Sequence, residues 1–261
     1  MTLWEYNRMN KNILLMFGLI GSAFSVRAEL TLNEVLDEYI EARGGIEVIE
    51  ATKTMRSTGK MTMGPMEAPF AFTYKAPNKI YTTFEVQGMT GIQAFDGETG
   101  WQVMPFMGKT EPQLMSEDEL KQTKDQADIE GPLVHAKAKG IQLELIGTTE
   151  IEGTPVIEIK ATKKNGDVVH VFLDEEYKLE VMTRATINMM GQDVEAETYF
   201  SDYKEVGESA VPVAHSMVVK FNGNAAQNLT LENIEININV DDSLFKMPVS
   251  AENEKASETT E

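Results

Sequence analysis

The spacing of apolar residues changes once near the start of the chain, from a helical period to a strand period. Over residues 30–45 apolar residues recur every three or four positions, Thr31 or Asn33 can cap the first turn, and Gly44-Gly45 follows, so we expect a helix there. From residue 53 onward apolar and polar residues alternate in run after run. This period of two is typical of half-buried strands.

About eleven or twelve strands are expected, separated by turn signals such as Asn165-Gly166 and Asn222-Gly223, which favour antiparallel hairpins. Two helical stretches interrupt them, over residues 116–128 and 133–139, and we expect these to lie across the rim of the sheet. The pattern predicts a mainly β fold with minor α, either a closed barrel or an open half-barrel with helices on its hollow side. Near Asn233 the apolar residues switch from odd to even positions, which predicts a bulge in the last strand.

The first residues have the composition of an export signal. Arg8 and Lys11 precede an apolar run over residues 13–24, and Ala28 offers a small residue at a cleavage point. We therefore expect residues 1–28 to be a secretory signal peptide that is cut near Ala28. Met9 begins a more typical signal, so Met1 and Met9 are both candidate starts.

The remaining chain is acidic and lacks cysteine. Removing residues 1–28, which hold three basic residues and one acidic residue, changes the formal net charge from −19 to −21. Such a charge disfavours nucleic acid and bare anionic membranes as partners. Residues 249–261 are acidic and rich in Ser, Thr and Glu, which predicts a disordered tail. Residues 29–248 are then expected to form one domain.

Candidate catalytic residues are few. The three histidines, His135, His170 and His215, fall on different predicted elements and none has the spacing of a metal site. Asp96 and Glu98 are the carboxylate pair that we would test for catalysis, but residues two apart near a turn are better explained by turn chemistry. We expect neither an enzyme nor a bound cofactor or metal.

A hairpin over residues 94–108 carries a family resemblance. Its sequence follows the pattern D-G-x-T-x-W-x-x-x-P-F, formed by Asp96, Gly97, Thr99, Trp101, Pro105 and Phe106. The pattern resembles the hairpin of the LolA-like carriers of outer-membrane lipoproteins, and the resemblance extends over about residues 30–248. It implies an open half-barrel with helices on the concave side. Ala76 stands where family members often carry a basic residue, so a glycerolipid or another hydrophobic cargo stays open beside lipoprotein.

Methionine is abundant between residues 55 and 115, and its unbranched thioether suits a surface that receives variable acyl chains. An ordinary methionine-rich core is the alternative. With the neighbouring aromatic residues and the resemblance, the pattern favours a hydrophobic cavity. Its expected lining is Met55, Met61, Met63, Phe70, Phe72, Ile80, Phe84, Trp101, Met104 and Phe106.

Two functions follow from this interpretation. The first is a monomeric periplasmic carrier that binds lipid or lipoprotein acyl chains and needs a membrane donor and an acceptor protein, neither of which the sequence identifies. The second is a regulatory or scaffold module of the same fold that senses lipoproteins through protein contacts, as in anti-sigma regulators whose domain is similar to this one.

Overall fold

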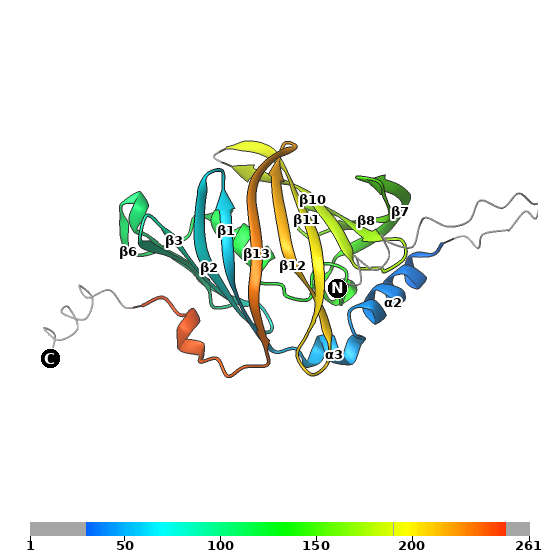
Figure 1. Ribbon diagram of the computed structural model, residues 1–261, viewed down its shortest axis with the longest axis horizontal. Helices are drawn as coiled ribbons and strands as arrows, with labels where there is room; N and C mark the ends of the chain where they lie inside the picture. Colours follow the sequence, from blue (N-terminus) through cyan, green and yellow to red (C-terminus); the bar gives the residue numbers. More distant parts are fainter. Residues whose placement is uncertain (1–29, 190, 249–261) are drawn as a thin grey trace, which may run out of the picture.

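Thirteen antiparallel strands form one curved sheet in the computed structural model of the chain (Figure 1). The structure describes residues 30–189 and 191–248. The expected signal peptide and the expected acidic tail lie outside the described residues, so both remain predictions.

The strands occupy more than half of the described chain. In chain order they are β1 (Thr54–Met63), β2 (Met66–Lys75), β3 (Lys79–Val86), β4 (Met89–Phe95), β5 (Gly100–Met104), β6 (Lys109–Leu114), β7 (Gln142–Ile151), β8 (Thr154–Thr162), β9 (Val168–Asp174), β10 (Glu180–Met189), β11 (Gln192–Val206), β12 (Val211–Phe221) and β13 (Asn224–Ile236). The helices are α2 (Leu32–Ala42), α3 (Ile46–Ala51), α4 (Glu117–Gln126) and α5 (Ala136–Lys139), with short 3₁₀ turns η1 (Pro105–Met107) and η2 (Asp242–Phe245).

The sheet runs in the order β6-β5-β4-β3-β2-β1-β13-β12-β11-β10-β9-β8-β7. Consecutive strands are therefore neighbours in space, except β6 and β7, and the two halves of the sheet meet where β1 pairs with β13. Within the described residues β6 and β7 end the sheet on opposite sides, so the sheet is open and the half-barrel prediction is confirmed. The expected count of eleven or twelve strands was too low. The missed strand, β6, is a polar edge strand around Pro112 that pairs only with β5, so it carries no alternating apolar signal.

The β1–β13 junction joins the two halves of the sheet. The pairing register shifts between Thr58, which faces Asn233, and Gly59, which faces Leu231, so the predicted bulge is confirmed. A Cβ atom at position 59 would collide with the main-chain carbonyl oxygen of Thr230. The close approach of β13 at its bulge therefore requires glycine at position 59.

Helices cover the concave side of the sheet near both ends. α2 starts at a capping box formed by Thr31 and Glu34, and its Val35 and Tyr39 are fully buried in one cluster with residues of β8 and β9. α4 starts at the capping box of Ser116 and Glu119, and Leu120 on α4 packs against the cluster around Ile80 and Phe95. The two helical covers leave the middle of the concave face between them.

The segment after β13 crosses to the other side of the sheet. Phe245 in η2 is fully buried, and Asp242 forms ion pairs with Lys75 Nζ at 2.8 Å and Lys79 Nζ at 3.0 Å. This segment therefore packs on the convex face of β2 and β3, away from the helical covers.

Candidate functional site

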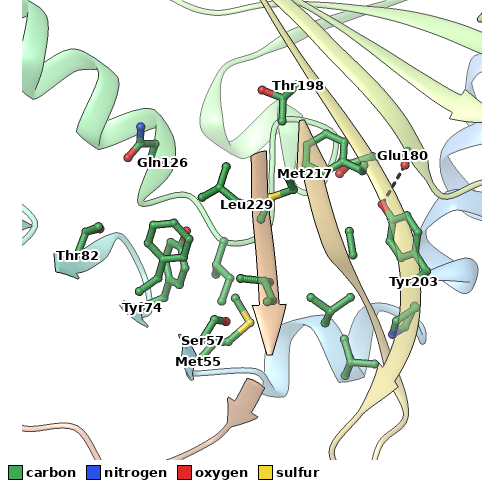
Figure 2. Close-up of a pocket in the computed structure, with 18 of the residues that line it drawn as sticks. Met55, Ser57, Tyr74, Thr82, Gln126, Glu180, Thr198, Tyr203, Met217 and Leu229 are labelled. Carbon is green, nitrogen blue, oxygen red and sulfur yellow. Dashed lines mark hydrogen bonds between the residues drawn. The ribbon is translucent and has the colours of Figure 1, made fainter. Parts of the chain in front are cut away.

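A cavity of about 640 Å³ occupies the middle of the concave face. Its walls come from β1, β2 and β3 on one side and from β11, β12 and β13 on the other (Figure 2). Residues of α2, of α3 and of the segment 126–130 complete its lining. The volume falls in the range of about 300–1,000 Å³ that is typical of small-molecule sites.

The cavity wall is mainly apolar. Six of the ten residues expected to line it do so: Met55, Met61, Met63, Phe70, Phe72 and Phe84. The second half of the sheet adds apolar residues that the sequence interpretation did not include, namely Phe200, Met217, Val219, Leu229, Leu231 and Ile236. The Phe70 and Phe72 rings lie 4.8 Å apart, and Phe72 and Tyr74 lie 6.1 Å apart, so aromatic contacts hold the β2 side of the wall.

Three other expected residues lie outside this lining. Ile80 is buried with Phe95 beneath the α4 cover, and Met104 is buried in β5. Phe106 belongs to η1, where its ring lies 5.8 Å from the Phe84 ring. Phe106 therefore contacts Phe84, which lines the cavity, but does not line the cavity itself.

Trp101 lies on the convex face, and its expected place in the cavity was wrong. It pairs with Ala94, which pairs in turn with Tyr81, and the Trp101 and Tyr81 rings lie 6.4 Å apart. The Trp101 Nε1 group donates a hydrogen bond to the main-chain carbonyl of Phe245. Because side chains alternate between the two faces of a strand, the neighbour Gln102 has the concave position that Trp101 was expected to hold.

One end of the cavity is polar. Tyr39 Oη donates to Glu180 Oε1 at 2.9 Å, and Arg43 Nη1 donates to Tyr39 Oη at 2.8 Å. Tyr203 Oη donates to the main-chain carbonyl of Glu180 at 2.9 Å. Burial and the nearby Glu180 carboxylate raise the pKa of both Tyr39 and Tyr203, so both phenols stay neutral and act as donors.

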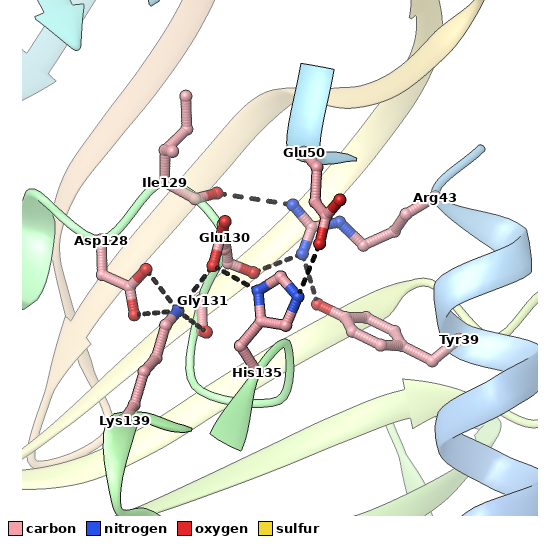
Figure 3. A network of polar contacts seen from close by, with 9 residues as sticks. All are labelled: Tyr39, Arg43, Glu50, Asp128, Ile129, Glu130, Gly131, His135 and Lys139. Carbon is pink, nitrogen blue, oxygen red and sulfur yellow. Dashed lines mark hydrogen bonds and ion pairs between the residues drawn. The ribbon is translucent and has the colours of Figure 1, made fainter. Parts of the chain in front are cut away.

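Arg43 also holds the segment that closes this end. Its guanidinium donates to the main-chain carbonyls of Glu130 and Ile129 (Figure 3). Lys139 on α5 holds the same segment from the other side, through Asp128 and the carbonyl of Gly131. The segment 128–131, which we call the gate segment, is thus fixed to both α2 and α5.

His135 adds two more contacts to the gate segment. Its Nδ1 atom lies 3.2 Å from Glu130 Oε2, and its Nε2 atom lies 3.1 Å from Glu50 Oε1 on α3. Lys139 Nζ also lies 3.2 Å from Glu130 Oε2. The contacts that hold the gate segment are therefore polar, and they come from α2, α3 and α5.

The sequence interpretation did not identify Tyr39, Arg43, Glu180 or Tyr203 as site residues. Tyr39 and Arg43 belong to the helical pattern over residues 30–45, whereas Glu180 on β10 and Tyr203 on β11 lie far along the chain from that helix. One signal was available for Arg43: a basic residue directly before Gly44-Gly45 at the end of the helix. No sequence feature indicated that Arg43 would bind the main-chain carbonyls of Ile129 and Glu130.

The described residues contain no group of three or more His, Cys, Asp or Glu side chains placed to hold a metal ion. Asp96 Oδ1 accepts hydrogen bonds from the main-chain N–H groups of Glu98 and Thr99, which is the role of a turn residue. Across the described part of the chain, every helix is too short or too polar to cross a membrane.

Comparison with solved structures decides the fold. An outer membrane lipoprotein-sorting protein domain from Vibrio parahaemolyticus superposes with a TM-score of 0.55 at 11% identity, over 82% of this chain and 96% of that chain. A LolA superfamily protein from Nitrosomonas europaea gives 0.53 at 11% identity, over 84% and 98%. This chain has the LolA-like fold.

A third similar structure is that of a DUF1329 family protein from Desulfovibrio piger, with a TM-score of 0.54 at 11% identity over 82% of this chain and 96% of that chain. No protein-family model and no curated protein matches the sequence. At this identity the likeness concerns the LolA-like fold alone. The cavity between sheet and helices must therefore carry any functional argument.

Proposed function

We propose that this LolA-like chain is a periplasmic carrier that holds lipid, or the acyl chains of a lipoprotein, in the concave cavity. The observation that carries the proposal is the cavity itself: about 640 Å³ of space lined by methionine, phenylalanine and leucine side chains. A well-packed domain leaves few voids larger than a water molecule. A space of this size with an apolar wall suits a hydrophobic guest.

The energetics of such a guest favour tight retention. Each buried methylene contributes about 0.8 kcal/mol, so a C16 chain gains on the order of 10 kcal/mol before ordering costs. Cargo bound this firmly leaves slowly unless the cover opens. We infer that transfer needs a membrane donor, an acceptor protein and movement of the gate segment. The chain is expected to act as a monomer.

Charge and export fit the same role. An acidic surface, with a formal charge of −21 after removal of residues 1–28, disfavours adhesion to anionic bilayers. A carrier of this kind remains in the space between donor and acceptor membranes instead of adhering to either. Cleavage near Ala28 would release the chain into that space.

A vesicle extraction assay tests the proposal. The purified protein is incubated with phosphatidylcholine vesicles that contain a fluorescent diacylated lipopeptide in one arm and a fluorescent phospholipid in the other. Vesicles are then removed by flotation, and label in the protein fraction is measured. We expect about one labelled lipid per protein in at least one arm, and the arms identify the cargo class. Absence of label from the protein fraction in both arms contradicts the proposal.

A further inference from the structure

A row of uncharged polar side chains crosses the apolar wall of the cavity. The direct pairing partners across five strands are Ser57 on β1, Phe72 on β2, Thr82 on β3, Gln93 on β4 and Gln102 on β5. Directly paired residues lie on the same face of a sheet, so all five belong to the concave face. Four of them are hydrogen-bonding residues without charge. The neighbouring rows on this face are dominated by Phe70 and Phe84 on one side and by Tyr74, Ile80 and Phe95 on the other.

Ser57 is the member of this row with an unmet hydrogen bond. Its side chain lines the cavity beside Met55 (Figure 2), and the residue is 1% exposed. Among the described residues its Oγ atom has no hydrogen-bond partner. Its direct cross-strand neighbours are Phe72 and Ile234, whose side chains offer none. A buried hydroxyl without a partner is costly and rare, so its presence in a cavity wall points to a partner on the guest.

Thr82 and Gln93 extend the same surface. Both line the cavity, and within the described residues their side chains make no hydrogen bond. Gln102 ends the row differently, because its Nε2 group donates to Glu119 Oε1 on α4 at 2.8 Å. Under α4 the row is therefore hydrogen-bonded to another protein side chain. Along the cavity wall its side chains have no hydrogen-bond partner within the described residues.

We propose that cargo displaces the side chains that now cover the Ser57 hydroxyl, so that Ser57 binds an acyl carbonyl of the cargo, with Thr82 and Gln93 providing further polar contacts along the row. This inference rests on the proposed carrier function and specifies its cargo: a chain that enters with its ester or amide group inside the cavity. A hydroxyl donor needs an acceptor, which a carbonyl oxygen supplies. The row contains no cation, and a buried carboxylate or phosphate without one is strongly disfavoured. Arg43, at the polar end, is already engaged by Tyr39 and two main-chain carbonyls.

A pair of matched lipids tests this assignment. Glycerol 1-monopalmitate has an ester carbonyl, whereas its ether analogue, 1-O-hexadecylglycerol, has the same chain length and head group without the carbonyl. Palmitoyl ethanolamide supplies the amide arm. We expect the native protein to prefer a carbonyl lipid over the ether by about 2- to 12-fold, the effect of one hydrogen bond. Ser57→Ala should reduce that ratio to about 1 without changing the affinity for the ether.

Thr58→Ala is the control, because Thr58 is adjacent to Ser57 and lies on the opposite face of β1. It should keep the native preference. Lipid-free Ser57→Ala should melt at or above the native temperature, since the substitution removes an unpaired buried hydroxyl. Equal native binding of ester, amide and ether lipids overturns the inference and leaves the carrier function intact, whereas failure of all three to bind overturns the carrier function. Retained preference in Ser57→Ala, or a lower melting temperature of its lipid-free form, overturns the role of Ser57.

Discussion

The indole Nε1 of Trp101 donates a 2.8 Å hydrogen bond to the main-chain carbonyl of Phe245, across the convex face of the sheet. Trp101→Phe leaves this carbonyl buried without a donor, which costs about 1–3 kcal/mol of the free energy of unfolding. Because the contact lies on the face opposite the cavity, lipid retention should stay at the native level. Denaturant unfolding and lipid content measure the two effects.

Tyr81→Phe is the control for this prediction. Tyr81 lies beside Trp101 on the same face, and within the described residues its hydroxyl makes no hydrogen bond, so stability should change by less than about 0.5 kcal/mol. A Trp101→Phe protein that folds with native stability and loses its lipid would place Trp101 in the cargo site.

The wall at Phe72 offers the most direct test of which face binds cargo. Phe72→Glu places a carboxylate in an apolar wall without a cation, a cost of several kcal/mol if the cavity is dry and less if water enters. We expect loss of bound lipid, or destabilisation of the fold. Ala71→Glu, one residue away on the convex face, should keep both lipid and stability. Identical lipid content and melting temperature for the two variants would contradict the assignment of faces.

Arg43 is expected to control the rate of cargo release. Arg43→Met removes the donors to Tyr39, Glu130 and Ile129, and loss of hydrogen bonds from a charged donor costs about 1.5–3 kcal/mol each where the acceptor stays buried. The gate segment should then open more often. Stopped-flow transfer of a fluorescent lipid to acceptor vesicles should be faster for this variant.

Arg56→Met is the matched control for Arg43, because Arg56 projects from the convex face of β1. It should leave the release rate at the native value. Release that is unchanged in Arg43→Met would show that cargo leaves by another route than the gate segment.

Acid should weaken the contacts of Glu130 that hold the gate segment in place. Burial tends to raise the pKa of Glu130, but hydrogen bonds from His135 and Lys139 outweigh burial and hold this pKa below its ordinary value of 4.5. A lowered carboxyl pKa means that the stabilisation is complete above pH 4.5 and is lost as the pH falls through the lowered value. Lipid release should therefore accelerate below pH 4.5.

Glu130→Gln should release lipid faster at neutral pH and show a smaller acceleration in acid. Glu150→Gln, an exposed substitution on β7, should keep the native pH profile. If Glu130→Gln and the native protein have the same release rate at pH 7, the Glu130 contacts do not hold the gate segment closed.

Local periodicity predicted much of this fold, and it failed where distant segments meet. The alternation around Phe70 and Phe72 identified half of the cavity wall, since it depends only on the period of a strand. The other half, around Leu229 and Met217, joins it through the pairing of Met55 with Ile236, and nothing in either segment specifies that partner. Trp101 was misplaced because its family pattern and apolar character suggested a buried site, but did not distinguish the two buried faces.

The central claim is that the concave cavity holds acyl cargo, and organic extraction of the protein purified from its native compartment tests it most directly. Mass spectrometry of the extract should find acyl lipid in about one copy per native chain and in Ala71→Glu, and much less in folded Phe72→Glu. A native protein that carries no acyl lipid, and that takes up none when lipid is added, would contradict the claim.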